Sequence, residues 1–265
     1  MNRPMERPMG RLRDRVALIT GGGAGIGAAT GRLFCQEGAA VVLIDRDGVC
    51  LEETARSIRD AVKGAKVAHY AADVADADEA LRAVAHGLAE FGRLDSLVNN
   101  AAMRNYASVA EATHADWKGV LDVNLIGAAN YAKAALPELR RAGNGSIVNV
   151  SSCYAVTGRK GMGIYDATKA ALLAFTRTLA FEEAAHGVRA NAVCPGSTLT
   201  TFQLKRGKAA GKTVDQLMAE RKDNSLIGRW GTPEEIAWPI LWLASGEASF
   251  ITGATLMVDG GLSIM

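Results

Sequence analysis

Tyr165 and Lys169 stand four residues apart in a stretch with helical spacing, so their side chains share one face of the predicted helix. A free tyrosine hydroxyl has a pKa of about 10, which is too high for an efficient general base at neutral pH. An ammonium group a few ångströms away favours the phenolate. The pair therefore predicts proton transfer to or from a substrate oxygen, whereas Tyr165 alone would be an ordinary tyrosine at the start of a helix.

A second candidate site is a glycine-rich turn between the first apolar stretch and the first helical stretch. It comprises Gly21, Gly23, Ala24, Gly25, Ile26 and Gly27. Glycine permits a tight bend, and the helix that follows offers free N–H groups and the positive end of its dipole to a pyrophosphate. Because the turn lies between a strand and a helix, it predicts dinucleotide binding rather than a simple tight turn.

The second and third predicted strands each end near an aspartate. Asp45 is placed to accept hydrogen bonds from ribose hydroxyls, and an NADP 2′-phosphate would meet like charge there. Ala24 supplies no basic residue to offset that charge. Arg46 could pair with a phosphate, so dual use stays open, but the pattern favours NAD over NADP. Asp73, followed by Val74, would accept from the adenine amino group or cap the next helix.

The elements that must position these residues alternate along the chain. Short, almost wholly apolar stretches at 16–20, 40–44, 66–71, 94–99, 146–151, 188–194 and 254–258 predict strands. Helical spacing covers 25–37, 48–62, 76–91, 114–141, 165–186 and 233–244, with Pro137 near the end of the fourth helix, where it should bend or cap it. Apolar strands in βαβ alternation predict a parallel sheet buried on both faces. The expected fold is α/β: a single-domain, doubly wound Rossmann fold with a seven-stranded parallel sheet and helices on both faces.

The expected organisation is a flexible, basic N-terminal tail over residues 1–13 and a single domain over residues 14–265. Residues 197–226 interrupt the alternation with basic and polar helical turns, and we expect them to form a lid over the substrate. The alternative interpretation is that its charged residues only make it a solvated, mobile segment.

The composition excludes several other classes of protein. A net charge of +2 over 265 residues does not indicate a surface that binds nucleic acid. No apolar run is long enough to span a bilayer. Cys35, Cys50, Cys153 and Cys194 are scattered without a CxxC pair, so we expect reduced thiols, no metal site and a cytoplasmic protein.

Several motifs in fixed order resemble the short-chain dehydrogenase/reductase family over about residues 14–262. They are the glycine turn at 21–27, Asn99-Asn-Ala-Ala102, Asn124, Ser151-Ser152, Tyr165-Asp-Ala-Thr-Lys169, Pro195-Gly196 and Asp259-Gly-Gly261. Two residues depart from the family's usual pattern: Ala102 stands where glycine is usual, and Thr198 where an aliphatic residue is commoner.

The resemblance implies an alcohol dehydrogenase or ketone reductase with a catalytic set of Asn124, Ser152, Tyr165 and Lys169. In that family Ser152 would polarise the substrate oxygen, Tyr165 would act as acid and base, Lys169 would also bind the nicotinamide ribose, and Asn124 would hold a water that links Lys169 to solvent. Ser151 and Asn99 would be structural. The remaining implied cofactor contacts are Asn100, Ala101, Ala102, Pro195, Gly196, Thr198 and Thr200.

The substrate is less clearly indicated. The candidate contacts are Arg104, Cys153, Arg159 and Met162, and basic residues near the rim favour a polar or anionic alcohol, sugar or hydroxy acid. The alternatives are an NADP-linked carbonyl or β-ketoacyl reductase, against which Asp45 and Phe181 argue, and a non-catalytic dinucleotide-binding scaffold. Because members of the family are commonly tetramers, the resemblance also implies a homotetramer. Trp238 and Trp242 would then be either core residues or subunit contacts.

Overall fold

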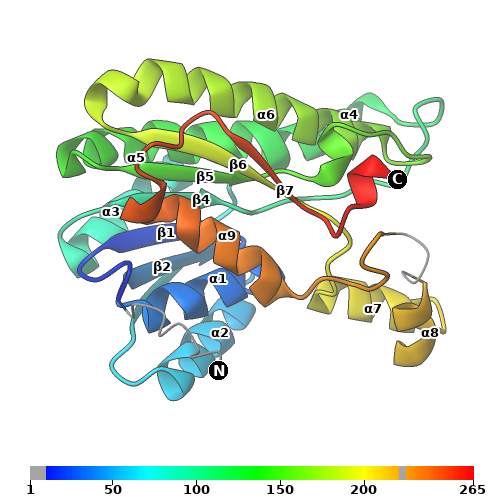
Figure 1. Ribbon diagram of the computed structural model, residues 1–265, viewed down its shortest axis with the longest axis horizontal. Helices are drawn as coiled ribbons and strands as arrows, with labels where there is room; N and C mark the ends of the chain where they lie inside the picture. Colours follow the sequence, from blue (N-terminus) through cyan, green and yellow to red (C-terminus); the bar gives the residue numbers. More distant parts are fainter. Residues whose placement is uncertain (1–9, 221–224) are drawn as a thin grey trace, which may run out of the picture.

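The computed structural model describes residues 10–220 and 225–265 (Figure 1). Its sheet has seven strands in the order β3-β2-β1-β4-β5-β6-β7, and every adjacent pair runs parallel. The strands are β1 (Val16–Thr20), β2 (Ala40–Asp45), β3 (Lys66–Ala71), β4 (Ser96–Asn99), β5 (Ser146–Val150), β6 (Arg189–Pro195) and β7 (Thr255–Val258). The predicted doubly wound Rossmann fold is confirmed.

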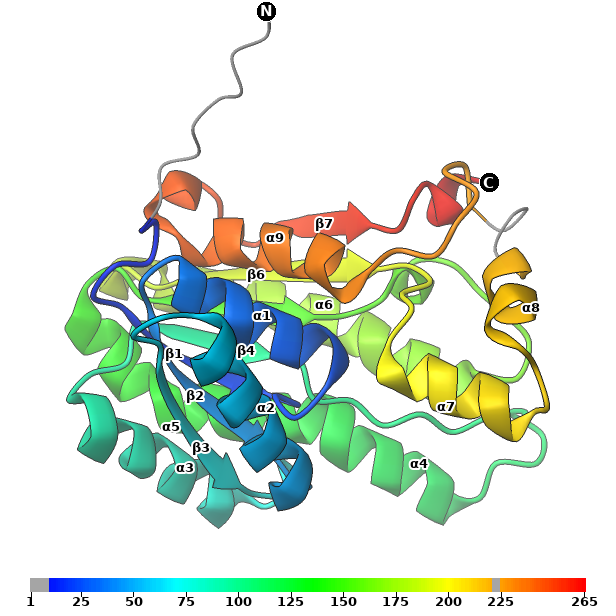
Figure 2. The ribbon, with the colours of Figure 1, turned by 90° about the horizontal axis from the view of Figure 1, so that it is seen from below.

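Helices cover both faces of the sheet (Figures 1 and 2). One face carries α1 (Gly25–Gln36), α2 (Gly48–Ala61) and α9 (Pro233–Ala244). The other carries α3 (Ala77–Phe91), α5 (Gly127–Ala142) and α6 (Gly163–Glu183). Trp238 and Trp242 are partly buried against the first of these cores.

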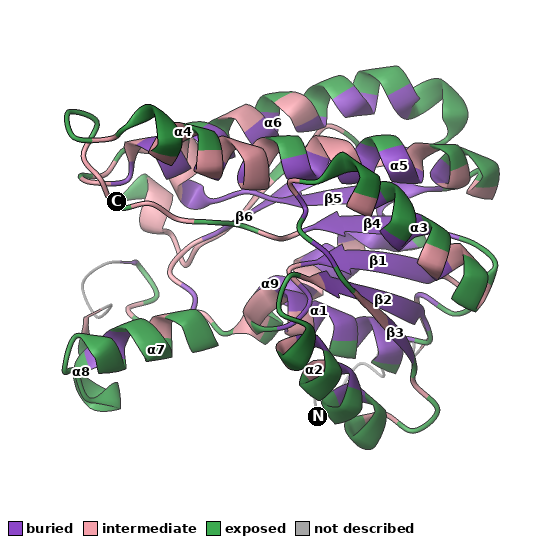
Figure 3. Ribbon diagram, turned by 180° about the vertical axis from the view of Figure 1, so that it is seen from behind, coloured by how far each residue is buried: buried purple, intermediate pink, exposed green. Residues whose placement is uncertain are grey.

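The strands read as continuous apolar runs because both of their faces are buried (Figure 3). Successive side chains point to opposite faces of a sheet. Along β1, Leu18 therefore packs with α3, α5 and α6, whereas Ile19 packs with α1, α2 and α9. Two-sided burial leaves no alternation of polar and apolar residues along the sequence.

The continuous helix predicted over 114–141 is wrong in one respect. The structure has α4 (His114–Leu121), then a π-helical turn (Asp122–Ile126), and then α5. The π turn contains Asn124, which is buried and hydrogen bonded to a neighbouring loop and helix. Wider turns of this kind are frequent at functional sites. Pro137 lies inside α5.

The predicted boundary of the N-terminal tail also needs correction. Residues 1–9 lie outside the described residues, but residues 10–13 pack against the end of α1. Leu12 is buried and its N–H donates to the carbonyl of Glu37, while the N–H groups of Gly10 and Arg11 donate to the Glu37 carboxylate. These contacts fix a segment that the sequence alone assigns to the tail.

The predicted lid segment contains α7 (Thr201–Ala209) and α8 (Val214–Ala219), which project beside the sheet (Figure 1). Its basic residues Arg221 and Lys222, together with Asp223, lie outside the described residues. No helix of the described chain has the length and apolarity to cross a membrane. Over the same residues, no cluster of histidine, cysteine and acidic side chains is arranged as a metal site.

Candidate active site

A cavity of about 660 Å³ lies at the carboxyl ends of the strands, where ligands bind in sheets of this kind. Its floor is formed by the segments that follow β1 to β6, and α7 closes one side. The cavity joins the glycine turn to the predicted catalytic residues, although the two are far apart in the sequence.

The glycine turn is held tightly against the end of β4. Gly21 has a φ of +64°, and a Cβ there would lie 2.7 Å from Asn100 Nδ2 and 2.9 Å from Ala101 Cα. A Cβ on Gly27 would lie 2.1 Å from the carbonyl oxygen of Gly21. Gly21, Ala24, Gly25 and Ile26 line the cavity, whereas Gly23 and Gly27 shape the turn from behind.

The first helix begins at this turn with its backbone N–H groups open. Its N-cap residue, Ala24, has no side-chain acceptor, whereas side chains cap α2, α3, α4, α8 and α9. An uncapped helix N-terminus beside a cavity is a ready site for a phosphate. The cradle therefore fits the pyrophosphate of a dinucleotide.

The adenosine side of the cavity is marked by the predicted acids. Asp45 lines the cavity, and its carboxylate accepts the N–H of Gly23 at 3.2 Å. Arg46, which is exposed, and Asp73 and Val74 line it as well. The capping alternative for Asp73 is wrong, because Asp76 caps α3.

The other predicted cofactor contacts lie along the same cavity. They are Asn100, Ala101, Ala102, Pro195, Gly196, Thr198 and Thr200. The side chain of Asn100 donates to the carbonyls of Thr20 and Gly21, and this locks the loop after β4 to the glycine turn. Thr200, at the start of α7, lies against Gly25 and so connects α7 to the cofactor end.

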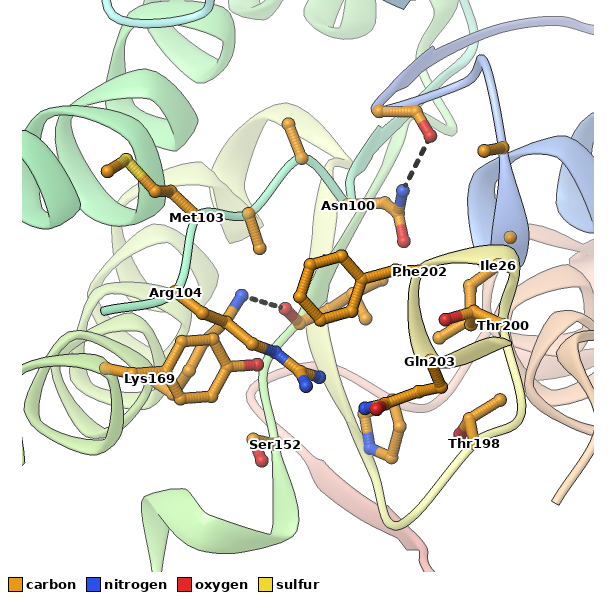
Figure 4. Close-up of a pocket in the computed structure, with 18 of the residues that line it drawn as sticks. Ile26, Asn100, Met103, Arg104, Ser152, Lys169, Thr198, Thr200, Phe202 and Gln203 are labelled. Atoms are coloured by element: carbon orange, nitrogen blue, oxygen red, sulfur yellow. Dashed lines mark hydrogen bonds between the residues drawn. The ribbon is translucent and has the colours of Figure 1, made fainter. Parts of the chain in front are cut away.

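Ser152, Tyr165 and Lys169 line the opposite end, and all are nearly inaccessible to solvent. Lys169 Nζ donates to the carbonyl of Val150 at 2.8 Å and lies 5.7 Å from the centroid of the Tyr165 ring (Figure 4). The Ser151 hydroxyl donates to the backbone carbonyl of Lys169, in keeping with the structural role expected of it.

Burial has the largest effect on the pKa values of Tyr165 and Lys169. It raises the pKa of Tyr165, against the opposing charges of Arg104 and Arg159 and hydrogen bonding from Arg104. Burial, with a smaller contribution from the positive charge of Arg104, lowers the pKa of Lys169 to about 7. The cations that counter the burial of Tyr165 are thus two arginines that the sequence suggested only as substrate contacts.

Asn124 connects two elements beside this group. Its side-chain carbonyl accepts the N–H of Met103 at 2.7 Å, and its amide donates to the Met103 carbonyl and to the Thr168 hydroxyl. The loop after β4 is therefore tied to α6. Asn99 donates to Asn149 of β5 and to the carbonyl of Ala128, so it braces the neighbouring strand as expected.

Of the four candidate substrate contacts, Arg104, Arg159 and Met162 line the cavity. Cys153 does not. Its side chain is fully buried, and burial raises the pKa of its thiol to about 12. The choice of Cys153 is therefore corrected: it follows Ser152 in sequence but points into the core.

The structure adds lining residues that the sequence did not single out as contacts. They are Met103, Tyr106, Tyr154, Phe202, Gln203, Arg206 and Trp230. Phe202, Gln203 and Arg206 fall in the predicted lid over residues 197–226, whereas Met103, Tyr106, Tyr154 and Trp230 fall outside it. Aromatic residues next to cations, as in Phe202-Gln-Leu-Lys-Arg206, were the available signal, but no spacing rule indicates which side chains turn inward.

Comparisons with known proteins agree with this geometry. A family model described as "Enoyl-(Acyl carrier protein) reductase" matches residues 21–263. The cis-4-hydroxycyclohexanecarboxylate dehydrogenase of Sinomonas cyclohexanicum is 42% identical over 252 residues, which cover 94% of this chain and 96% of that protein. The 2-(S)-hydroxypropyl-CoM dehydrogenase 3 of Xanthobacter autotrophicus is 38% identical over 253 residues, which cover 96% of this chain and 98% of that protein.

A solved structure is similar to this chain over nearly its whole length. The L-sorbose reductase of Gluconobacter frateurii, crystallised with NADPH and L-sorbose, has a TM-score of 0.92 and 32% sequence identity. The match covers 98% of this chain and 100% of that chain. The likeness therefore extends through the glycine turn, the catalytic end and α7.

Proposed function

Because the chain belongs to the short-chain dehydrogenase/reductase family, we propose that it is a NAD-dependent dehydrogenase that interconverts a secondary alcohol and a ketone. As a member of that family it is an oxidoreductase of alcohols or ketones and binds a nicotinamide dinucleotide. The proposal adds the preference for NAD, the roles of the catalytic residues and the class of substrate.

One observation carries the proposal: Ser152, Tyr165 and Lys169 line one end of a cavity whose other end is the uncapped glycine turn. A dinucleotide that lies along the cavity, with its pyrophosphate at α1, would place its far end beside these residues. The bound nicotinamide supplies the site that accepts or donates hydride.

The residues of the chain then divide the remaining chemistry. The phenolic oxygen of Tyr165 takes the proton from the alcohol in oxidation and returns it in reduction. The Ser152 hydroxyl donates to the substrate oxygen and stabilises the charge that develops there. Lys169 favours the phenolate by its charge and binds ribose hydroxyls, and Asn124 connects Lys169 to solvent through a water.

Asp45 supports the preference for NAD. Its carboxylate faces the cavity beside the glycine turn and accepts from Gly23, so it is held where a ribose would lie. A 2′-phosphate would meet its negative charge. Arg46 and the NADPH-bound relative favour a second candidate, an NADP-linked carbonyl reductase.

The substrate that fits best is a small, polar secondary alcohol or hydroxy acid. Two relatives are named for alcohols that carry a second functional group, a ring carboxylate in one and a CoM group in the other. The homotetramer and the cytoplasmic location expected from the sequence remain predictions, and light scattering of the purified protein would test the first.

The proposal is tested by following NADH absorbance with a panel of secondary alcohols, sugars and hydroxy acids, with NAD and NADP in parallel. We expect turnover with NAD, and a loss of about 10²- to 10⁴-fold in Tyr165→Phe with NADH affinity retained. Ser152→Ala should lose activity in the same way. Near wild-type turnover in Tyr165→Phe would contradict the assignment, and a preference for NADP would support the second candidate.

A further inference from the structure

Three arginines gather at the catalytic end of the cavity. Arg104 comes from the loop after β4, Arg159 from the segment before α6, and Arg206 from α7. Among the described residues, the acidic side chains that line the cavity are Asp45 and Asp73, and both belong to the adenosine side. The catalytic end, which also holds Lys169, is therefore rich in positive charge and has no acid in its described lining.

The three arginines are not equally available to a ligand. Arg159 lies 5.5 Å from the centroid of the Tyr165 ring, but it is paired with Asp166 at 2.9 Å and lies over the Tyr154 ring at 3.7 Å. Arg206 is exposed at the rim, where it lies 4.8 Å from the centroid of the Tyr106 ring. Arg159 already has a carboxylate partner, and Arg206 lies at the rim, so neither is an open partner for an anion at the reacting centre.

Arg104 differs from both. Its guanidinium lies 5.3 Å from the centroid of the Tyr165 ring and 5.4 Å from that of Phe202, and it reaches into the cavity toward α7 (Figure 4). It is half-buried, and it forms no ion pair with any residue of 10–220 or 225–265. A guanidinium that is half removed from water without a carboxylate partner is an open site for a planar anion.

We propose that the substrate is a hydroxy acid or keto acid whose carboxylate is bound by Arg104. This inference rests on the proposed function, because it places the carboxylate on the same molecule as the carbon whose oxygen meets Tyr165, and close to it. The short distance between Arg104 and the Tyr165 ring limits the spacer to a few carbon atoms. Phe202 and Met103 offer apolar surface to that spacer.

The charge balance of the site supports this assignment. Arg104 and Lys169 repel each other, and this repulsion contributes to the low pKa of the buried ammonium. A carboxylate on Arg104 offsets that repulsion and favours the protonated form of Lys169.

The alternative is that Arg104 only holds α7 closed by stacking on Phe202. Matched ligands separate the two roles, because a closing role affects charged and uncharged ligands alike. The ligands are three pairs of equal shape: butanoate and butanamide, cyclohexanecarboxylate and cyclohexanecarboxamide, and benzoate and benzamide. They are titrated calorimetrically into protein saturated with NADH, whose reduced ring adds no positive charge.

We expect the carboxylate of at least one pair to bind about tenfold or more tightly than its amide. Arg104→Gln should abolish that preference and leave the affinity for the amide within about twofold. Arg104→Lys, which keeps the charge without the two-pronged geometry, should retain part of it. Arg56→Gln, which removes an exposed arginine of α2 outside the cavity, should change neither affinity.

Equal or absent binding of carboxylate and amide in all three pairs would overturn the inference, as would a preference that survives Arg104→Gln. If Arg104→Gln does not fold, the test relies on Arg104→Lys. An unchanged preference for the carboxylate over the amide in Arg104→Lys would then overturn the inference. NADH affinity and Tyr165-dependent turnover are measured first in the same preparation. Turnover of uncharged alcohols without a preference for carboxylates would therefore leave the proposed function intact while it removes this inference.

Discussion

The end of the cavity beside β1 and β2 is shaped by backbone, whereas the end beside α6 and α7 is shaped by long side chains. At the first end, Gly21 and Gly25 adopt positive φ and α1 starts without a side-chain cap. At the second, arginines and aromatic rings from separate segments meet. A backbone-shaped site tolerates few changes in its residues, while a side-chain site can be altered without loss of the fold.

The two ends also differ in charge and exposure. Asp45 and Asp73 mark the first, and Arg104, Arg159 and Arg206 mark the second. Gly22, Gly23 and Gly27 of the glycine turn are buried, but Phe202 at the second end is 49% exposed. The comparison suggests that cofactor binding is fixed by the fold, and that substrate choice is decided by a few partly exposed side chains. Four substitutions test this division between the two ends.

The largest effect is expected from Gly21→Ala. A left-handed φ strains alanine, and the new Cβ would meet Asn100 and the backbone of Ala101. We expect the free energy of unfolding to fall by roughly 2–4 kcal/mol, and the Kd for NADH to rise by about tenfold or more. Denaturant titration and NADH fluorescence measure the two.

Gly64→Ala is the matched control. Gly64 has a φ of +77° but nothing within 4 Å of a new Cβ. It should cost only the backbone strain, about 1 kcal/mol, with the NADH affinity unchanged. Equal losses in both variants would mean that the close packing of the glycine turn contributes nothing.

Lys169→Met tests the boundary between the two ends. Burial lowers the pKa of Lys169 to about 7 in the folded protein, below its value in the unfolded chain. Between pH 7 and 9 the unfolded state therefore binds more protons, and the wild type gains stability as the pH rises. Relative to Lys169→Met, which lacks this group, the cofactor-free wild type should gain about 2 kcal/mol over that range.

Urea denaturation of both proteins at pH 7 and pH 9 gives the difference directly. Because each protein is compared with itself at the two pH values, any effect of the substitution that does not depend on pH cancels. If the free energy of unfolding changed equally with pH in the two proteins, burial would not lower the pKa of Lys169.

Asp45→Asn should shift the cofactor preference. The amide keeps an oxygen for the N–H of Gly23 but loses the charge that repels a 2′-phosphate. We expect the ratio of NAD to NADP affinity to fall by about tenfold, as measured by fluorescence with the two reduced cofactors. Arg46→Gln should move the ratio in the opposite direction. An unchanged ratio of NAD to NADP affinity in Asp45→Asn would show that the charge of Asp45 does not cause the preference for NAD.

The smallest effect is expected from Phe202→Ala. An exposed cation–π contact contributes about 0.5–1 kcal/mol, so KM for the substrate should rise about two- to fivefold. The Kd for NADH should stay the same, since Phe202 belongs to the other end. A change in NADH affinity as large as the change in KM would show that the two ends are not separable.

Much of the fold was predictable because its signals are local. Apolar runs such as Val16–Thr20 mark buried strands, and the turn at 21–27 is specified by glycines that stand close together. The π turn at Asp122–Ile126 escaped prediction because helical spacing continues on either side of it. The packing of residues 10–13 escaped because it depends on Glu37, which is distant in sequence.

The parallel sheet, the glycine turn and the pairing of Tyr165 with Lys169 follow from the amino-acid sequence alone, since a helix brings residues four apart onto one face. The tertiary structure, in contrast, turns Cys153 into the core and Arg104 toward Tyr165. It also decided that burial, countered by two arginines, raises the pKa of Tyr165. The physical reason is that burial and charge at a point depend on every segment that reaches it, and those segments meet only in the folded chain.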